Sequence, residues 1–166
     1  MRNLIAIPVI LLTVMLQSAV ISRVNLLSGI ADLPLVMLAA WALQDGVDSA
    51  WHWAIATGLL VGFISGISWV VPVGGYITVV VMSYLFQRRV WQAPLLAMFT
   101  ITFLGTILVS LFSMVVLQFS GVELPMSDVL GLVMLPGVLL NMLLAIPVYA
   151  VMRDLARWVY PTPEVE

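Results

Sequence analysis

Cysteine and lysine are absent from this chain of 166 residues, and only one histidine, His52, is present. Without cysteine, the chain has no disulfides, no thiolate metal site and no thiol nucleophile. With one histidine, a transition-metal site would need carboxylates inside the apolar runs. The sequence also contains no HExxH, GxSxG or Walker phosphate-binding motif. These absences argue against an enzyme, a resident cofactor and a metal site.

Charge is scarce as well, since 8% of the residues are charged, against about 25% in a typical soluble domain. Hydrophobic residues make up 63% of the chain, and the mean hydropathy is +1.19. The six basic residues are dispersed arginines and the net charge is -2, so no nucleic-acid partner is expected. The composition predicts a single all-α integral membrane domain over residues 1–166, surrounded by a lipid bilayer.

Charged residues divide the apolar sequence into stretches near the length of about 20 residues that a helix needs to cross a bilayer. The stretches predict six membrane-spanning helices: residues 4–22, about 26–43, two within 49–87, 94–117 and 129–152. The first stretch is longer than the core of a secretory signal, so we expect it to be retained as a span. The two helices within 49–87 are expected to join at a tight turn, Pro72-Val73-Gly74-Gly75.

The second stretch contains an acidic residue, Asp32. Because Leu33–Leu43 alone is too short to cross at about 1.5 Å per residue, we expect this helix to begin near Leu26 and to carry Asp32 and Pro34 within its outer end. An ionisable group at that depth is a candidate functional residue. In the alternative interpretation, Asp32 simply caps the helix and Pro34 lies in its first turn.

The distribution of arginines predicts the orientation. If the N-terminus is cytoplasmic, Arg23 alone faces outward, and the cytoplasmic side carries Arg2, Arg88, Arg89, Arg153 and Arg157. Both termini are therefore expected in the cytoplasm. Aromatic residues fall at the predicted cytoplasmic span ends, as is typical of membrane interfaces: Trp51, Trp53, Trp91, Trp158 and Tyr160. His52, between two tryptophans, is interpreted as interfacial rather than as a proton carrier.

Small residues recur every four positions in the predicted third span: Ala54, Gly58, Gly62 and Gly66. This spacing places them on one side of a helix, and small residues let helices approach closely in lipid. These small residues form a groove that can receive a neighbouring helix. That helix belongs either to this chain or to another protein. Partner surfaces are expected at two further pairs, Gly105 with Ser113 and Gly131 with Gly137.

The other polar residues at membrane depth are uncharged. We expect most of them to form hydrogen bonds between helices, which is their usual role in bilayers. They are Gln17, Thr57, Ser65, Ser68, Thr78, Ser83, Thr102, Thr106, Ser110 and Asn141.

Several of these features together resemble a known family. The sequence Asp-Leu-Pro enters the second span at Asp32, the segment GFISG at residues 62–66 precedes an outer turn, and the last span reads NMLLAIPVYAVMRDL. In size and order these features are similar to the rod shape-determining protein MreD family over nearly the whole chain. The most specific positions are Asp32, Gly62, Gly66, Asn141, Pro147, Tyr149 and Arg153. Many family members carry an acid shortly after the second glycine, where this chain has Ile67-Ser68-Trp69-Val70-Val71.

The resemblance implies a non-catalytic membrane scaffold of the bacterial cell-elongation machinery, located in the inner membrane. The implied partners are the bitopic protein MreC and, through it, the glycosyltransferase RodA, a class B penicillin-binding protein and MreB filaments. The resemblance also implies a fold like that of the substrate-binding subunits of energy-coupling-factor transporters. A vitamin-binding subunit is therefore the alternative function, and it would need a pocket near the outer face, where the sequence offers Trp69, Tyr76, Glu123 and Asp128.

Overall fold

The computed structural model describes residues 5–19, 21–87, 93–121 and 125–160. As predicted, this part of the chain is almost entirely helical, with α1 (Ala6–Ala19), α2 (Leu33–Ala42), α3 (Ala50–Ser65), α4 (Val70–Gln87), α5 (Pro94–Phe119) and α7 (Leu135–Val159). A single turn, α6 (Met126–Asp128), and a π-helical segment, Val129–Met134, lead directly into α7. Between α1 and α2 lie a 3-10 turn, Ile21–Arg23, and a small antiparallel hairpin of β1 (Asn25–Leu26) and β2 (Gly29–Ile30).

Four helical segments of the described chain are long and apolar enough to cross a membrane: Ala6–Arg23, Val70–Gln87, Pro94–Phe119 and Val129–Val159. The chain therefore has the character of a multi-pass membrane protein. α2 and α3 are apolar but have only 10 and 16 residues. At 1.5 Å per residue they extend about 15 Å and about 24 Å, against a hydrocarbon core of about 30 Å. Helix length thus establishes four possible crossings, and six stays a prediction.

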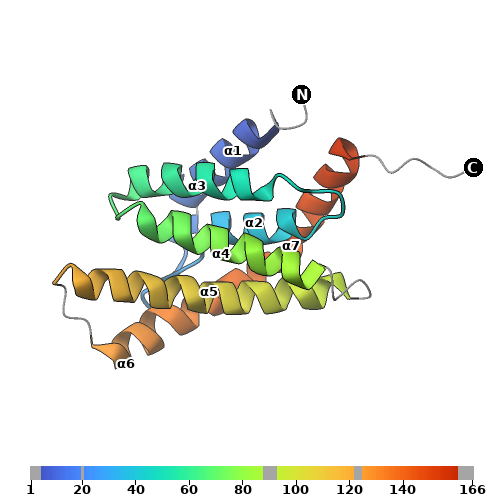
Figure 1. The fold of residues 1–166 in the computed structure, drawn as a ribbon. Helices are drawn as coiled ribbons and strands as arrows, with labels where there is room; N and C mark the ends of the chain where they lie inside the picture. Colours follow the sequence, from blue (N-terminus) through green and yellow to red (C-terminus); the bar gives the residue numbers. More distant parts are fainter. Residues whose placement is uncertain (1–4, 20, 88–92, 122–124, 161–166) are drawn as a thin grey trace, which may run out of the picture.

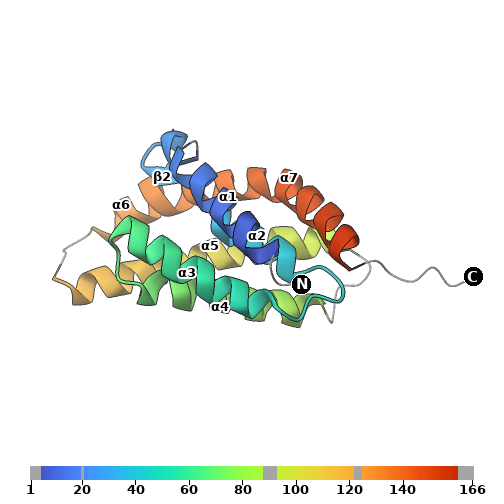
Figure 2. The same ribbon diagram turned by 90° about the horizontal axis from the view of Figure 1, so that it is seen from above.

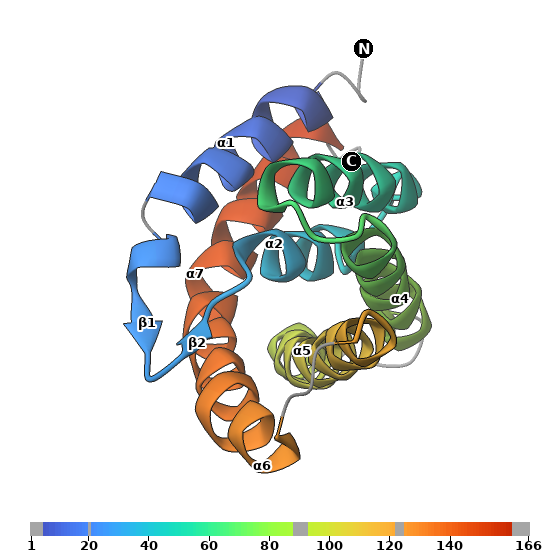
Figure 3. The ribbon, with the colours of Figure 1, turned by 90° about the vertical axis from the view of Figure 1, so that its left-hand side faces the viewer.

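The helices run back and forth along one long axis (Figure 1). We call the end at which α2, α4 and α7 finish the terminal end, and the end with the α3–α4 connection the turn end (Figure 1). Seen along the axis, α2 lies in the middle and the other long helices surround it (Figure 3). α1 crosses obliquely over α2, and the β-hairpin lies beside α7 (Figures 2 and 3).

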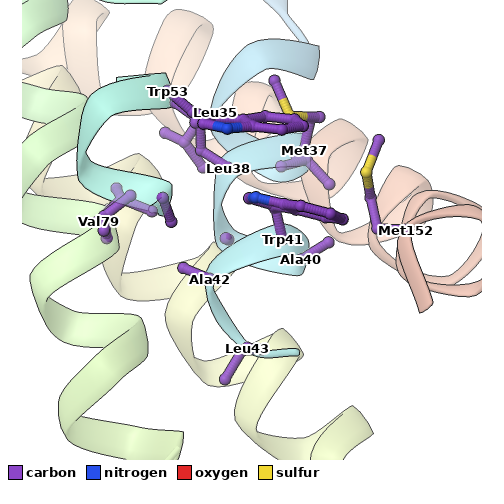
Figure 4. Close-up of a cluster of buried hydrophobic side chains, with 14 of the residues drawn as sticks. Leu35, Met37, Leu38, Ala40, Trp41, Ala42, Leu43, Trp53, Val79 and Met152 are labelled. Atoms are coloured by element: carbon purple, nitrogen blue, oxygen red, sulfur yellow. The ribbon is translucent and has the colours of Figure 1, made fainter. Parts of the chain in front are cut away.

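The core is built around α2, all of whose residues are buried. A helix that is apolar on every side is expected in such an interior position. Trp41 of α2 stacks on Trp53 of α3 with ring centroids 4.5 Å apart, and Met152 of α7 lies beside this pair (Figure 4). Trp53 is only 2% exposed, so its ring packs inside the bundle and does not face lipid, and its position at the membrane interface stays a prediction. Trp51 and Trp158 are exposed, and Trp91 lies outside the described residues.

The turn between α3 and α4 lies at residues 66–69, not at residues 72–75 as the sequence suggested. α3 ends at Gly66, whose φ of 66° is in the left-handed region that glycine adopts without strain. Pro72 stands in the first turn of α4, where its missing N–H breaks no helical hydrogen bond. Gly75 lies inside α4 against Val109 of α5. The Pro-Gly pattern therefore serves helix packing here, not chain reversal.

The second helix begins at Leu33 instead of near Leu26, so the prediction of a longer helix is wrong. The preceding residues form the β-hairpin, in which Leu27 has a φ of 56° that is incompatible with a helix. The Asp32 side chain accepts a hydrogen bond from the N–H of Leu35 at 3.0 Å, and Pro34 lies in the first turn. The capping interpretation of Asp32 is therefore the one that the structure supports.

Candidate functional site

α2 begins in the interior of the bundle, so its first N–H groups need partners away from water. Its ten residues place Asp32 about 15 Å from the end of α2 at Ala42, a distance equal to half of a hydrocarbon core of about 30 Å. Irregular backbone at such a depth must be satisfied by the protein itself. Asp32 satisfies two N–H groups, because its carboxylate accepts from Leu35 at 3.0 Å and its carbonyl accepts from Val36 at 3.1 Å.

Gln17 of α1 satisfies the peptide groups on both sides of Asp32. Its Nε2 donates to the carbonyl of Ala31 at 2.8 Å, and its Oε1 accepts from the N–H of Leu33 at 2.9 Å. Both groups lie where the chain passes from the hairpin into α2 and have no strand or helix partner. The side-chain amide of Gln17 therefore satisfies the backbone polar groups at the point where the hairpin ends and α2 begins.

Three further helices reach the same point. The hydroxyl of Tyr76 in α4 donates to Asp32 Oδ1 at 3.0 Å and to Oδ2 at 3.3 Å. The backbone N–H of Asp32 donates to Asn141 Oδ1 of α7 at 2.6 Å, and Asn141 Nδ2 donates to Thr106 Oγ1 of α5 at 2.9 Å. We call these five side chains, Gln17, Asp32, Tyr76, Thr106 and Asn141, the Asp32 network. It connects α1, α4, α5 and α7 to the start of α2.

The hairpin before Asp32 is held by the segment that leads into α7. Pro136 has no N–H to offer the carbonyl of Leu132, four residues earlier, and the N–H of Ser28 donates to that oxygen at 3.0 Å. Gly29 lies so close that an added Cβ would be 2.7 Å from the backbone nitrogen of Gly137. Gly137 therefore packs on the hairpin. An added Cβ on Gly131 would contact nothing within 4 Å, so the predicted Gly131–Gly137 partner surface is wrong.

Gly58 and Gly62 of α3 lie against the beginning of α4. An added Cβ would be 2.7 Å from the Cα of Val73 at Gly58, and 2.9 Å from the Cα of Trp69 at Gly62. The neighbour at these two positions is thus a segment of this chain. Gly66 does not share the contact, because nothing lies within 4 Å of its added Cβ. The prediction of three glycines in one groove is wrong for Gly66, which instead ends the helix.

The remaining residues that we singled out from the sequence lie away from the Asp32 network. Pro147 is exposed inside α7, and Tyr149 is buried two turns closer to the terminal end than Asn141. Of these three positions on α7, only Asn141 has a hydrogen bond to the Asp32 network. Gly105 of α5 lies beside Val79 of α4, so it does not form a surface with Ser113 for α3.

Of the ten polar residues for which we expected bonds between helices, three have such a bond in the described structure, so the prediction is wrong for most of them: Gln17, Thr106 and Asn141. Thr78, Ser83 and Ser113 each donate to the carbonyl four residues earlier. The buried hydroxyls of Thr57 and Thr102 have no hydrogen-bond partner among the residues that the structure describes. The bonds of the Asp32 network cross between helices because the longer Gln, Tyr and Asn side chains reach beyond their own backbone.

A cavity of about 120 Å³ adjoins Asp32 on the side of the turn end. Its polar lining comes from Asp32, Ser65, Tyr76 and Ser113, and the rest is apolar. Within the described part of the chain, Asp32 has no basic side chain at ion-pair distance. Nor does that part contain three His, Asp or Glu side chains close enough to hold a metal ion. The site is a carboxyl and hydroxyl cluster with space for a few water molecules.

No family model matches this chain, and no match was found among curated proteins or solved structures.

Sequence reasoning identified Asp32 and Asn141 but did not pair them, and it missed the bond from Tyr76 to Asp32. Tyr76 is 44 positions from Asp32, and Asn141 is 109 positions from it. The sequence could have paired Tyr76 with Asp32 only through their similar distances from the ends of their helices. Tyr76 stands 11 residues before the end of α4 at Gln87, about 17 Å at 1.5 Å per residue, which is close to the depth of Asp32.

Proposed function

We propose that this chain is a non-catalytic membrane scaffold of the bacterial rod-shape machinery, as its resemblance to the MreD family implies. It would bind a bitopic MreC-like protein and, through it, a RodA-like glycosyltransferase, a class B penicillin-binding protein and MreB filaments. Two residues of the resemblance, Asp32 and Asn141, are joined by a hydrogen bond of 2.6 Å despite their separation in sequence. This contact supports a role of these residues in holding the helices together.

The observation that favours a scaffold over a vitamin-binding subunit is the size of the cavity at Asp32. Pockets for small organic ligands usually measure about 300–1,000 Å³. The cavity at Asp32 has about 120 Å³, and the carboxylate that lines it already accepts hydrogen bonds from Leu35 and Tyr76. A vitamin at Asp32 would need both more space and free polar groups. A wider hollow of about 740 Å³ at the turn end has the space, but among the described residues its polar side chains are only Ser68 and the indole of Trp69.

We also propose six crossings with both termini in the cytoplasm of a bacterial inner membrane. α2 would complete the second crossing together with the hairpin segment before it, since the Asp32 network and α7 satisfy that irregular backbone. The arginine distribution gives the orientation. Reporter fusions after Glu166 test it: a cytoplasmic reporter should be active there, and activity of a periplasmic reporter alone would refute the orientation.

Purification in mild detergent tests the scaffold proposal directly. The full chain is co-expressed with an MreC-like protein, and the purified material is examined by mass spectrometry before and after denaturation. A scaffold should retain the single-span partner and release no stoichiometric small molecule. Release of one vitamin-sized molecule per chain, without partner retention, would favour the transporter subunit instead.

The absence of cysteine makes the contact face measurable. Single cysteines can replace three exposed side chains on different helices: Leu12 on α1, Phe63 on α3 and Leu143 on α7. If the partner binds one face, only the cysteine on that face should cross-link to a cysteine in the partner's span. Equal cross-linking at all three positions would indicate random collisions in the bilayer and would argue against a specific complex.

A further inference from the structure

A second, larger cleft of about 530 Å³ lies at the terminal end of the bundle, away from the Asp32 network. The end of α2, the end of α4, the start of α5 and the last turns of α7 form its walls. Its polar lining includes Gln44, Asp45, Gln87, Tyr149, Arg153 and Arg157. Neither the scaffold proposal nor the Asp32 network accounts for this cleft.

Two arginines dominate the charge of the cleft. Arg153 and Arg157 are four residues apart on α7, so they lie on the same side of the helix. Arg157 has no ion pair among the described residues, and Arg153 pairs only with its neighbour Asp154, at 3.4 Å. Both partners of that pair are largely exposed, so the pair holds Arg153 weakly. Asp45 is the one carboxylate in the described lining, which leaves an excess of positive charge.

The cleft also has an apolar wall, formed by Leu43, Leu95 and Ala97. It lies at the ends of the apolar helices, where the exposed rings of Trp51 and Trp158 are placed as in a membrane interface. A cationic site beside an apolar wall at this level suits a molecule that has an anionic head and an apolar tail.

We propose that this cleft binds the phosphate group of an anionic phospholipid. Arg153 and Arg157 donate to the phosphate oxygens, for which guanidinium groups are geometrically suited. Leu43, Leu95 and Ala97 contact the beginning of the acyl chains. An inorganic phosphate ion would meet the same arginines but would leave the apolar wall without a contact, so the lipid is the favoured source of the phosphate.

The test is binding of defined lipids to the full chain in neutral detergent, measured by native mass spectrometry and by titration in mixed micelles. Dioleoylphosphatidylglycerol should bind more tightly than dioleoylphosphatidylcholine or inorganic phosphate. At about 1 kcal/mol per arginine near a membrane surface, Arg153→Gln or Arg157→Gln alone should weaken this binding about five-fold, and both together about 30-fold. Arg23→Gln is the matched control, since Arg23 is exposed and does not line the cleft, and it should change nothing.

Equal affinity for the two lipids, or unchanged affinity in the double variant, would overturn the proposal. Inorganic phosphate that binds as tightly as the anionic lipid would show a free-ion site and would overturn the assignment to lipid. If the double glutamine variant does not fold, Arg153→Lys with Arg157→Lys keeps the charge and removes the guanidinium geometry. The lysine pair should then bind the anionic lipid several-fold more weakly, and unchanged binding would contradict the role of the arginines.

Discussion

Gly58→Ala probes the closest contact between α3 and α4. The added Cβ would lie 2.7 Å from the Cα and 2.8 Å from the backbone nitrogen of Val73, whereas carbon atoms in ordinary contact are about 3.5–4.0 Å apart. Because both atoms belong to the backbone, no change of side-chain rotamer relieves the overlap. The two helices must separate by about 1 Å, which also loosens the neighbouring contact at Gly62.

Overpacking of this kind lowers the free energy of unfolding by about 1–3 kcal/mol. Because the overlap is with backbone atoms, we expect the upper part of this range, about 2–3 kcal/mol. Alanine recovers about 1 kcal/mol of it through its higher helix propensity, which leaves a net loss of about 1–2 kcal/mol. For a chain of this size, each kcal/mol corresponds to about 2–4 °C in the midpoint of thermal unfolding. The variant should therefore unfold about 2–8 °C below the parent, as measured by circular dichroism in detergent.

Gly131→Ala is the matched control, because nothing lies within 4 Å of the added Cβ and the residue is helical. Its midpoint should equal that of the parent or exceed it slightly. A Gly58→Ala midpoint within 1 °C of the parent would refute the close approach of α3 and α4. An equal drop in Gly131→Ala would show that the loss has a cause other than the contact with Val73.

The Asp32 network yields three further predictions, each measured as the free energy of unfolding in mild detergent. Asp32→Asn keeps the acceptor for Leu35 and should lose less than about 1 kcal/mol, while Asp32→Ala should lose about 1–2 kcal/mol. Asp32→Asn could also abolish cell-shape maintenance while protein level and partner binding stay normal. In that case the negative charge itself is needed, and capping alone does not explain the role of Asp32. Gln17→Leu leaves two buried peptide groups unpaired and should lose about 2–4 kcal/mol; a loss below 1 kcal/mol would contradict this role. Tyr76→Phe removes one donor and should lose about 1 kcal/mol, and a gain in stability would contradict that.

Local chemistry was predictable from the sequence. Asp32 followed by Leu33 and Pro34 is a typical helix start, in which the capping side chain accepts a hydrogen bond from the N–H three residues later. The structure contains this bond, from the N–H of Leu35. The error concerned the length of the helix. We assumed that an apolar helix must be long enough to cross, whereas the residues before Asp32 are supported by Gln17 and by the segment before α7, which no local pattern indicates.

The position of the α3–α4 turn was misjudged for a related reason. In water, Pro-Val-Gly-Gly is typical of a turn because glycine weakens a helix. In lipid, where helices gain from close backbone approach, glycine inside a helix is common, and Gly75 faces Val109 of the next helix. Only a backbone angle identifies Gly66 as the residue that ends α3, and such an angle depends on how the chain reverses between two packed helices.

The enclosed position of α2 has a consequence for how the protein is made. Each of its residues is covered by other helices, and the acceptor for the N–H of Asp32 is Asn141 in α7, which is synthesised after α1 to α5. The chain leaves the ribosome N-terminus first, so α2 must wait in the membrane until α7 arrives. During that interval the N–H of Asp32 has no acceptor, and the side of α2 that α7 will cover faces lipid. A chain that stops before residue 141 lacks this acceptor, so the start of its α2 keeps an unpaired N–H and an uncovered flank.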